Sequence, residues 1–241
     1  MPSPPGLVAK ERLYKQPHEA EKLRQAAALT DEAFSHILNV IKPGMKEVEV
    51  ALELERYIRV AGAEGKSFDF IVASGHRSAM PHGAASQKTI QKGDLVTIDF
   101  GAVVDGYHAD MTRTFAVDKI KDSHRHIYDS VLMAQEAALK AITPYKKGKE
   151  IDEVARNILK EQGLGDYFSH GLGHGVGLEI HEAPSLSPLK EDEILEPHMT
   201  ATIEPGAYIP GDAGVRIEDL VIITEDGYER LSHSDKHFLE L

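Results

Sequence analysis

The sequence contains no cysteine. The chain can therefore form no disulfide bond, no zinc site with thiolate ligands and no cysteine nucleophile. It also lacks any run of about 18 apolar residues, the length that a transmembrane helix needs, and its N-terminal segment has no apolar core of a signal peptide. We therefore expect a cytoplasmic protein that makes no contact with a membrane.

Clusters of positive charge are lacking as well. The chain has 27 lysines and arginines against 39 aspartates and glutamates, which gives a net charge of −12. Nucleic acids bind proteins through basic patches that neutralise their phosphates. We therefore expect no nucleic-acid partner.

The 241 residues suffice for a large hydrophobic core. The Pro/Ser/Gly-rich opening indicates a tail or linker remnant at residues 1–15, and a single domain is expected over 16–241. Helices, then strands, then helices and strands again indicate an α+β fold with an antiparallel sheet. The apolar spacing predicts helices at about 17–41, 47–61, 123–142 and 150–162, and strands at 68–74, within 94–117 and from 165 onward.

The segment 94–117 predicts a β-hairpin that brings two aspartates together. Asp105-Gly106 is a favoured two-residue turn, and with it the numbers of paired residues sum to 211. Asp99 and Asp110 then lie one diagonal step apart on a polar face, while the opposite face is apolar except for Arg113. Two close carboxylates need either a retained proton or a shared cation. The alternative is a solvated outer face.

Two glutamates interrupt apolar strands near the C-terminus. Glu204 lies in "TATIEPGAYI" and Glu218 lies in "GVRIEDLVI". A carboxylate that is buried without a partner costs several kcal/mol, so each glutamate requires a cation, an arginine or a proton. For Glu218, an ion pair with Arg216 within the sheet is the alternative to a metal.

These four carboxylates and one histidine would form a site with five ligands. Their four negative charges balance two divalent cations, as in a two-metal centre with a bridging water or hydroxide. Carboxylates with a single imidazole are a hard ligand set, which favours Mn²⁺ or Fe²⁺ over structural zinc. We expect two divalent ions, with Mn²⁺ first and with Fe²⁺, Co²⁺ and Zn²⁺ as alternatives.

The stretch "SHGLGHGVGLEIHE" supplies three histidines in a glycine-rich setting. The residues between His170 and His174 discourage a helix, and no glutamate follows His170, so the zinc-binding H-E-x-x-H arrangement is excluded. The glycines do not match G-x-G-x-x-G either. On an extended backbone His170 and His174 share a face, and His181 points elsewhere. One histidine can then bind metal while the others contact substrate.

The chain resembles the pita-bread metallopeptidases, which include Xaa-Pro aminopeptidase, Xaa-Pro dipeptidase (prolidase) and methionine aminopeptidase. The resemblance covers roughly residues 15–241. It implies a curved antiparallel sheet with helices on its outer face and a pseudo-twofold between its halves. The motifs that carry it are "MPHG" at 80–83, "GDLVTIDFGAVVDGYHADMTRTF" at 93–115, "GHGVGLEIHEAP" at 173–184, "TIEPGAY" at 202–208 and "GVRIEDLV" at 214–221.

The resemblance also implies a role for each site residue and a small peptide as substrate. Glu204 matches the general base, and His82, His170 and His181 match histidines that act in catalysis and contact the substrate. Tyr208 and Arg216 are assigned to substrate binding. The residues that match the five metal ligands are Asp99, Asp110, His174, Glu204 and Glu218.

The motifs look most like those of the Xaa-Pro branch, so the expected reaction is hydrolysis between an N-terminal residue and proline. A methionine aminopeptidase and a non-catalytic peptide-binding homologue are the alternatives. The Xaa-Pro enzymes usually carry a further N-terminal domain that helps them dimerise. Because that domain is missing from this sequence, a homodimer is an open expectation.

Overall fold

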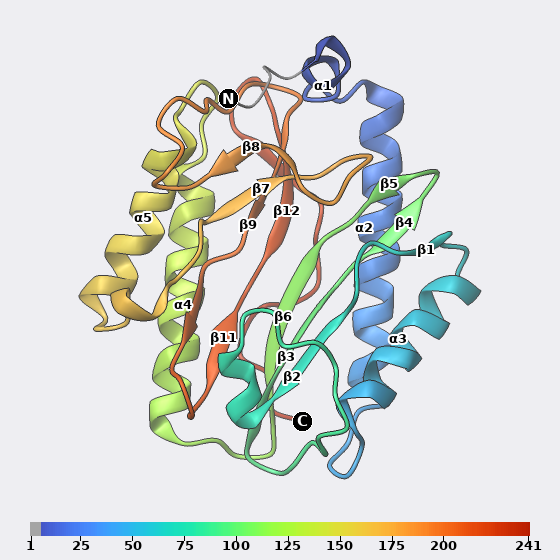
Figure 1. Cartoon of the computed structure of the whole chain (residues 1–241), viewed down its shortest axis with the longest axis vertical. Coiled ribbons are helices and arrows are strands. Elements are labelled where there is room, and N and C mark those ends of the chain that lie inside the picture. Colours follow the sequence, from blue (N-terminus) through green and yellow to red (C-terminus); the bar gives the residue numbers. More distant parts are fainter. Residues whose placement is uncertain (1–5) are drawn as a thin grey trace.

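The computed structural model describes residues 6–241 (Figure 1). Its helices are α1 (Leu7–Glu11), α2 (Pro17–Leu38), α3 (Glu47–Val60), α4 (Asp122–Ala141) and α5 (Gly148–Glu161), with short 3₁₀ helices η1 (Gly75–Ala79) and η2 (Gly165–Tyr167). Its strands are β1 (Gly65–Lys66), β2 (Ile71–Ser74), β3 (Asp94–Phe100), β4 (Ala102–Val104), β5 (Tyr107–His108), β6 (Met111–Val117), β7 (Gly173–Gly175), β8 (Glu182–Leu186), β9 (Thr200–Ile203), β10 (Gly206–Tyr208), β11 (Gly214–Arg216), β12 (Asp219–Ile223) and β13 (Tyr228–Arg230).

Two similar halves face each other across the centre of the molecule. In the first half the antiparallel sheet β2-β3-β6 packs on α2 and α3, and in the second half the sheet β13-β12-β9 packs on α4 and α5. Figure 1 shows the strands in the middle and the two pairs of helices on the outside. This arrangement confirms the expected α+β class, and it leaves the inner faces of the strands free to carry polar side chains.

Amphipathic spacing explains why the helices lie on the outside. In α5, Ile151, Ala155 and Leu159 recur every four residues and are fully buried against the second sheet. At the start of α2, the backbone N–H of Gln16 donates to the carboxylate of Glu19 at 2.8 Å, which closes a capping box. None of the helices over residues 6–241 is long and apolar enough to cross a membrane.

The hairpin has the predicted register. Asp99 pairs with Thr112 and Val104 pairs with Tyr107, and both turn residues, Asp105 and Gly106, have positive φ, as the expected turn type requires. Arg113, the exception on the apolar face, is buried and bonds to the Asp219 carboxylate at 2.7 Å. This ion pair links β6 of the first half to β12 of the second.

The hairpin differs from the prediction in one respect: each predicted strand is divided in two. The break in the first strand lies at Gly101, where a β-carbon would come within 1.8 Å of the carbonyl oxygen of Ala109. The close crossing of the two chains at this point requires glycine. Asp110 lies within the second break, directly before β6.

The segment predicted as a tail is also more ordered than expected. It contains α1, and Lys15 is only 4% exposed. The Lys15 ammonium donates to the Glu182 carboxylate at 3.2 Å, and Arg12 bonds to the same carboxylate. These ion pairs attach residues 12–15 to the domain, which corrects the predicted tail, while residues 1–5 lie outside the described part of the chain.

Candidate metal centre and active site

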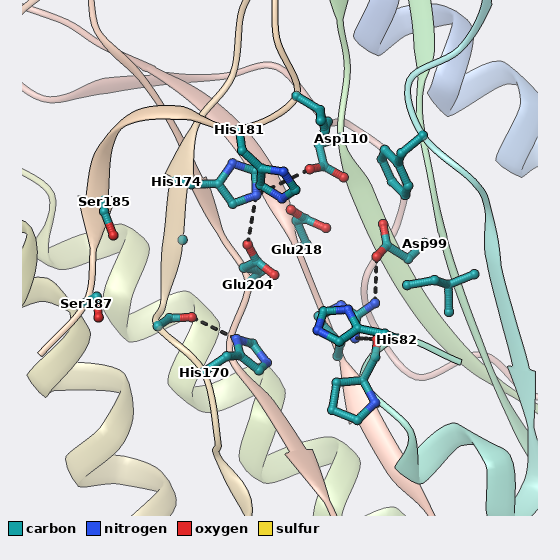
Figure 2. Close-up of a pocket in the computed structure, with 17 residues that line it drawn as sticks. His82, Asp99, Asp110, His170, His174, His181, Ser185, Ser187, Glu204 and Glu218 are labelled. Carbon is teal, nitrogen blue, oxygen red and sulfur yellow. Dashed lines mark hydrogen bonds and ion pairs between the residues drawn. The ribbon is translucent and has the colours of Figure 1, made fainter. Parts of the chain in front are cut away.

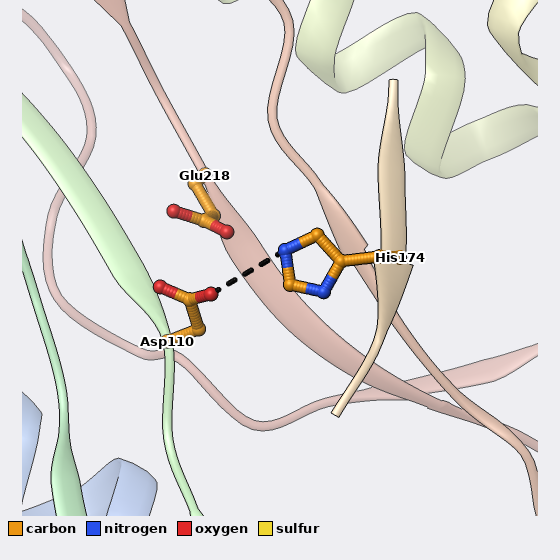
Figure 3. Close-up of side chains that lie close together, drawn as sticks. All are labelled: Asp110, His174 and Glu218. Atoms are coloured by element: carbon orange, nitrogen blue, oxygen red, sulfur yellow. Dashed lines mark ion pairs between the residues drawn. The ribbon is translucent and has the colours of Figure 1, made fainter. Parts of the chain in front are cut away.

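The five predicted metal ligands converge from different elements on one cavity of about 370 Å³. Asp99 lies on β3, His174 on β7, and the other three stand at the ends of β6, β9 and β12. His174 Nε2 lies 3.3 Å from Glu204 Oε1 and 3.6 Å from Asp110 Oδ2. Figure 3 shows Asp110, His174 and Glu218 pointing at one another, with one ligand atom of each lying within 4.8 Å of the others.

The donor set fits divalent cations. Asp99 Oδ1 and Glu218 Oε1 are buried and have no hydrogen-bond partner among the described residues. Burial, together with the neighbouring carboxylates, raises the pKa of Asp99 and raises the pKa of Asp110 and Glu218 well above their ordinary values. Without a metal these carboxyl groups therefore hold protons more tightly than free ones do, and a divalent cation would supply the missing positive charge.

Glu204 behaves differently from the other carboxylates. Burial acts to raise its pKa, but the hydrogen bond and the positive charge of His174 outweigh burial and hold the pKa of Glu204 to about 2. Burial likewise acts to lower the pKa of His174, and Glu204 raises it instead. His174 Nδ1 lies 3.0 Å from the carbonyl oxygen of Gly175, which places a hydrogen on Nδ1 and directs Nε2 at the carboxylates.

Hydroxyls and one arginine hold the carboxylates in place. The Thr112 hydroxyl donates to Glu218 Oε2 at 2.7 Å, and the Thr202 hydroxyl donates to Glu204 Oε1 at 3.0 Å. Arg216 donates to Asp99 Oδ2 at 2.6 Å. The alternative ion pair between Arg216 and Glu218 is therefore wrong, because the guanidinium reaches across from β11 to β3.

All three histidines assigned to substrate line the cavity (Figure 2). His82 follows η1, and the His181 ring lies 4.4 Å from the His174 ring. Burial lowers the pKa of His170, and burial followed by the charge of His174 lowers the pKa of His181. Both rings are therefore neutral above pH 7. His181 can donate a hydrogen bond to a peptide oxygen, whereas the Nδ1–H of His170 already donates to the carbonyl oxygen of Gly171 at 2.8 Å.

Tyr208 is buried beside the cavity, where it contacts other side chains of the protein. It is 5% exposed, and its hydroxyl lies 2.9 Å from His170 Nε2 and accepts a hydrogen bond from Arg216 at 2.8 Å. Burial raises the pKa of Tyr208 to about 12, so it is a neutral phenol. In this structure it holds the imidazole and the guanidinium in place, and its own substrate contact stays a prediction.

Several further residues line the cavity, although most of their side chains carry no signal in the sequence that marks them as part of a site. The apolar side chains Phe68, Ile71 and Ile180 and the hydroxyls of Ser185 and Ser187 complete the lining. The one available signal was for Ile180, which lies in the histidine-rich stretch directly before His181. Ser185 reaches the cavity because β8 pairs with β7, which carries the ligand His174. The other residues come from loops and short strands whose place in the fold has no sequence signature.

The glycines of the histidine stretch allow backbones to approach closely. A β-carbon at Gly173 would lie 1.9 Å from the carbonyl oxygen of Thr202, and one at Gly175 would lie 2.2 Å from that of Ala183. Strand β7 can therefore lie directly against β9 and β8. This contact brings His174 to Glu204.

Antiparallel strands with helices on the outside and a buried carboxylate–histidine cluster at the centre define the metallopeptidase class of pita-bread fold. The model of metallopeptidase family M24 matches residues 21–225, and the chain belongs to this family. Both the resemblance found in the sequence and the predicted fold are thereby confirmed.

The similar proteins include peptidases of bacteria and archaea. The chain is 50% identical to the uncharacterized peptidase YqhT of Bacillus subtilis over 97% of this chain and 66% of that protein, and 48% identical to an Xaa-Pro dipeptidase of Pyrococcus furiosus over 95% and 65%. Among solved structures, an Xaa-Pro dipeptidase from Bacillus anthracis has a TM-score of 0.96 at 50% identity, covering 98% of this chain and 66% of that one. An X-Pro aminopeptidase from Thermotoga maritima has a TM-score of 0.94 at 42% identity, covering 97% and 66%. The chain thus spans about two thirds of the length of the curated relatives it matches.

Proposed function

We propose that this protein is a metal-dependent exopeptidase that hydrolyses the bond between an N-terminal residue and proline in small peptides. The observation that carries the proposal is the buried cluster of four carboxylates and His174, with two carboxylate oxygens that lack a partner in the described chain. The relatives named Xaa-Pro dipeptidase and X-Pro aminopeptidase support the proline specificity. The expected location is the cytoplasm.

Two divalent cations would be held by Asp99, Asp110, His174, Glu204 and Glu218. We propose Mn²⁺ first, with Fe²⁺, Co²⁺ and Zn²⁺ as alternatives, because the set is mainly carboxylate. When bound, the metals would lower the pKa of a water molecule and polarise the scissile carbonyl.

The protein side chains would then move the proton and hold the developing charge. Glu204 is ionised and would accept a proton from the attacking water, then deliver it to the proline nitrogen. That nitrogen belongs to a tertiary amide and carries no hydrogen before cleavage. His181 is neutral and would donate a hydrogen bond to the carbonyl oxygen as it becomes negative. His170 would shape the substrate site instead, because its Nδ1–H already donates to the Gly171 carbonyl oxygen and its Nε2 faces the Tyr208 hydroxyl.

A panel of peptides tests this function. With Mn²⁺, Co²⁺ or Zn²⁺ added to metal-stripped protein, Ala-Pro-Ala should be cleaved and Ala-Ala-Ala should not. Glu204→Gln should lose at least about 10²-fold in kcat as the general base is removed. Wild-type rates in this variant would contradict the assigned base.

The same panel separates the alternatives. Preference for Met-Ala-Ser would identify a methionine aminopeptidase. Failure to cleave any peptide, together with no gain in melting temperature on adding metal, would favour a non-catalytic peptide-binding homologue. Sedimentation of the protein tests for a homodimer.

A further inference from the structure

The cavity contains very little positive charge from the protein. Over residues 6–241, Arg216 is the only lysine or arginine in its lining. Arg216 is 3% exposed, and its hydrogen bonds go to Asp99, Thr112, Tyr208 and the carbonyl oxygen of Pro81. This guanidinium is thus committed to the protein and has little capacity left for a substrate.

Two serine hydroxyls form the wall next to the ligand His174. Ser185 pairs directly with His174 across strands β7 and β8, and directly paired residues place their side chains on the same face about 5 Å apart. Figure 2 shows Ser185 and Ser187 on the opposite side of the cavity from Asp99. The Ser185 hydroxyl makes no hydrogen bond to any described residue, and the Ser187 hydroxyl accepts one from the backbone of Leu189 at 3.3 Å. Both hydroxyls can still donate.

The length of a substrate decides which group lies beside the scissile bond. In a free Xaa-Pro dipeptide, the terminal carboxylate carbon is three bonds from the scissile carbonyl carbon, which is at most about 4 Å. A dipeptide cleaved at the metal centre would therefore bring its carboxylate into the cavity. In a longer peptide the same position is a neutral amide carbonyl.

The lining favours the amide. Arg216, the one guanidinium in the described lining, is already bonded to protein acceptors. The charges of two divalent metals would be taken up by the four carboxylates of the cluster. A carboxylate would then be desolvated without a cationic partner, whereas an amide carbonyl needs only one hydroxyl donor.

We propose that this chain selects peptides of three or more residues over free Xaa-Pro dipeptides, and that Ser185 and Ser187 form the neutral subsite for the carbonyl that follows the scissile bond. This inference rests on the proposed function.

Matched substrates test the selectivity. Ala-Pro, Ala-Pro-amide and Ala-Pro-Ala share the scissile bond and differ in the charge beside it. At pH 8, kcat/KM should be at least tenfold higher for the amide and the tripeptide than for the dipeptide. Proline, which keeps the carboxylate, should inhibit more weakly than prolinamide in the same assay. Equal or better cleavage of Ala-Pro would overturn the inference.

A pair of variants tests the cause. Ser185→Arg adds a cation beside the subsite, and Ser185→Gln adds similar length without charge. The arginine variant should reduce the preference for Ala-Pro-amide over Ala-Pro by at least fivefold, and the glutamine variant should leave it within twofold of wild type. An equal change in both would refute the electrostatic reasoning. If Ser185→Arg lowers the melting temperature strongly, Ser187→Arg and Ser187→Gln provide the same comparison.

Failure of the inference is distinguishable from failure of the function. Cleavage of all three proline substrates without the expected order refutes the subsite alone. Cleavage of none of them, while Met-Ala-Ser is cleaved, refutes the proposed Xaa-Pro activity.

Discussion

Replacing Asp110 with asparagine should make the metal-free protein more stable and should remove most of its response to metal. Ligand oxygens of Asp110 and Glu218 lie within 4.8 Å of each other. Two carboxylates at that distance repel by about 3 kcal/mol at an effective dielectric constant of about 20. The metal-free protein avoids part of this cost by retaining protons, so about 1–3 kcal/mol remains to be gained from the neutral amide.

Thermal unfolding measures this effect. In a chain of this size each kcal/mol changes the melting temperature by about 2–4 °C, so Asp110→Asn with a chelator present should melt about 2–12 °C above wild type. In wild type, metal at about 100 times its dissociation constant adds about 2.7 kcal/mol. The variant should gain less than half of the wild-type increase at the same metal concentration, because it has lost a charged ligand.

Asp166→Asn is the matched control. Asp166 is an exposed aspartate in η2, so the same chemical change there should leave both melting temperatures close to wild type. The prediction is that the Asp110 carboxylate both repels its neighbours in the metal-free protein and binds the metal. It would be refuted if Asp110→Asn were less stable than wild type without metal and gained as much stability as wild type when metal is added.

Three further predictions follow from the same contacts. Thr112→Val removes the hydroxyl that orients Glu218, and calorimetric titration with Mn²⁺ should show a 10- to 100-fold loss of affinity, roughly as for other residues that hold a metal ligand; unchanged affinity would contradict that role. Lys15→Met removes a cation from the nearly buried Glu182, and urea unfolding should show a loss of about 1–3 kcal/mol, with exposed Lys10→Met as the control. The folded-state pKa values of Asp110 and Glu218 are raised, so the metal-free protein should be most stable below their unfolded-state pKa values and should lose stability as the pH rises through the folded-state values. Saturating metal should abolish this loss. A melting temperature that does not change with pH when a chelator is present would contradict the prediction.

The sequence predicts best those parts of the site that depend on local geometry. A two-residue turn and the alternation of strand side chains suffice to bring Asp99 and Asp110 to one face, and the structure has that register. The residue pattern alone could not choose among His170, His174 and His181, because all three lie in one glycine-rich stretch. That choice came from the resemblance, and in the structure it is His174 that lies beside Asp110 and Glu204.

The partners of Arg216 show where sequence reasoning fails. Proximity along the strand suggested Glu218, two residues away, but in the structure Glu218 receives the hydroxyl of Thr112, and Arg216 crosses to Asp99. A side chain as long as arginine bonds to whatever the packing of strands places within its reach, and that packing joins residues more than a hundred positions apart. The cavity serines were missed for the same reason.

The glycine-rich stretch links stability to chemistry. Positions 173 and 175 require glycine because neighbouring backbones leave no space for a β-carbon at Gly173 or Gly175. The immediate role of these glycines is therefore packing. That packing moves β7 against β9, which brings an imidazole to a buried carboxylate cluster that carries too much negative charge to be stable by itself. The same close approach therefore completes the ligand set, and metal affinity and backbone geometry should change together in variants of this stretch.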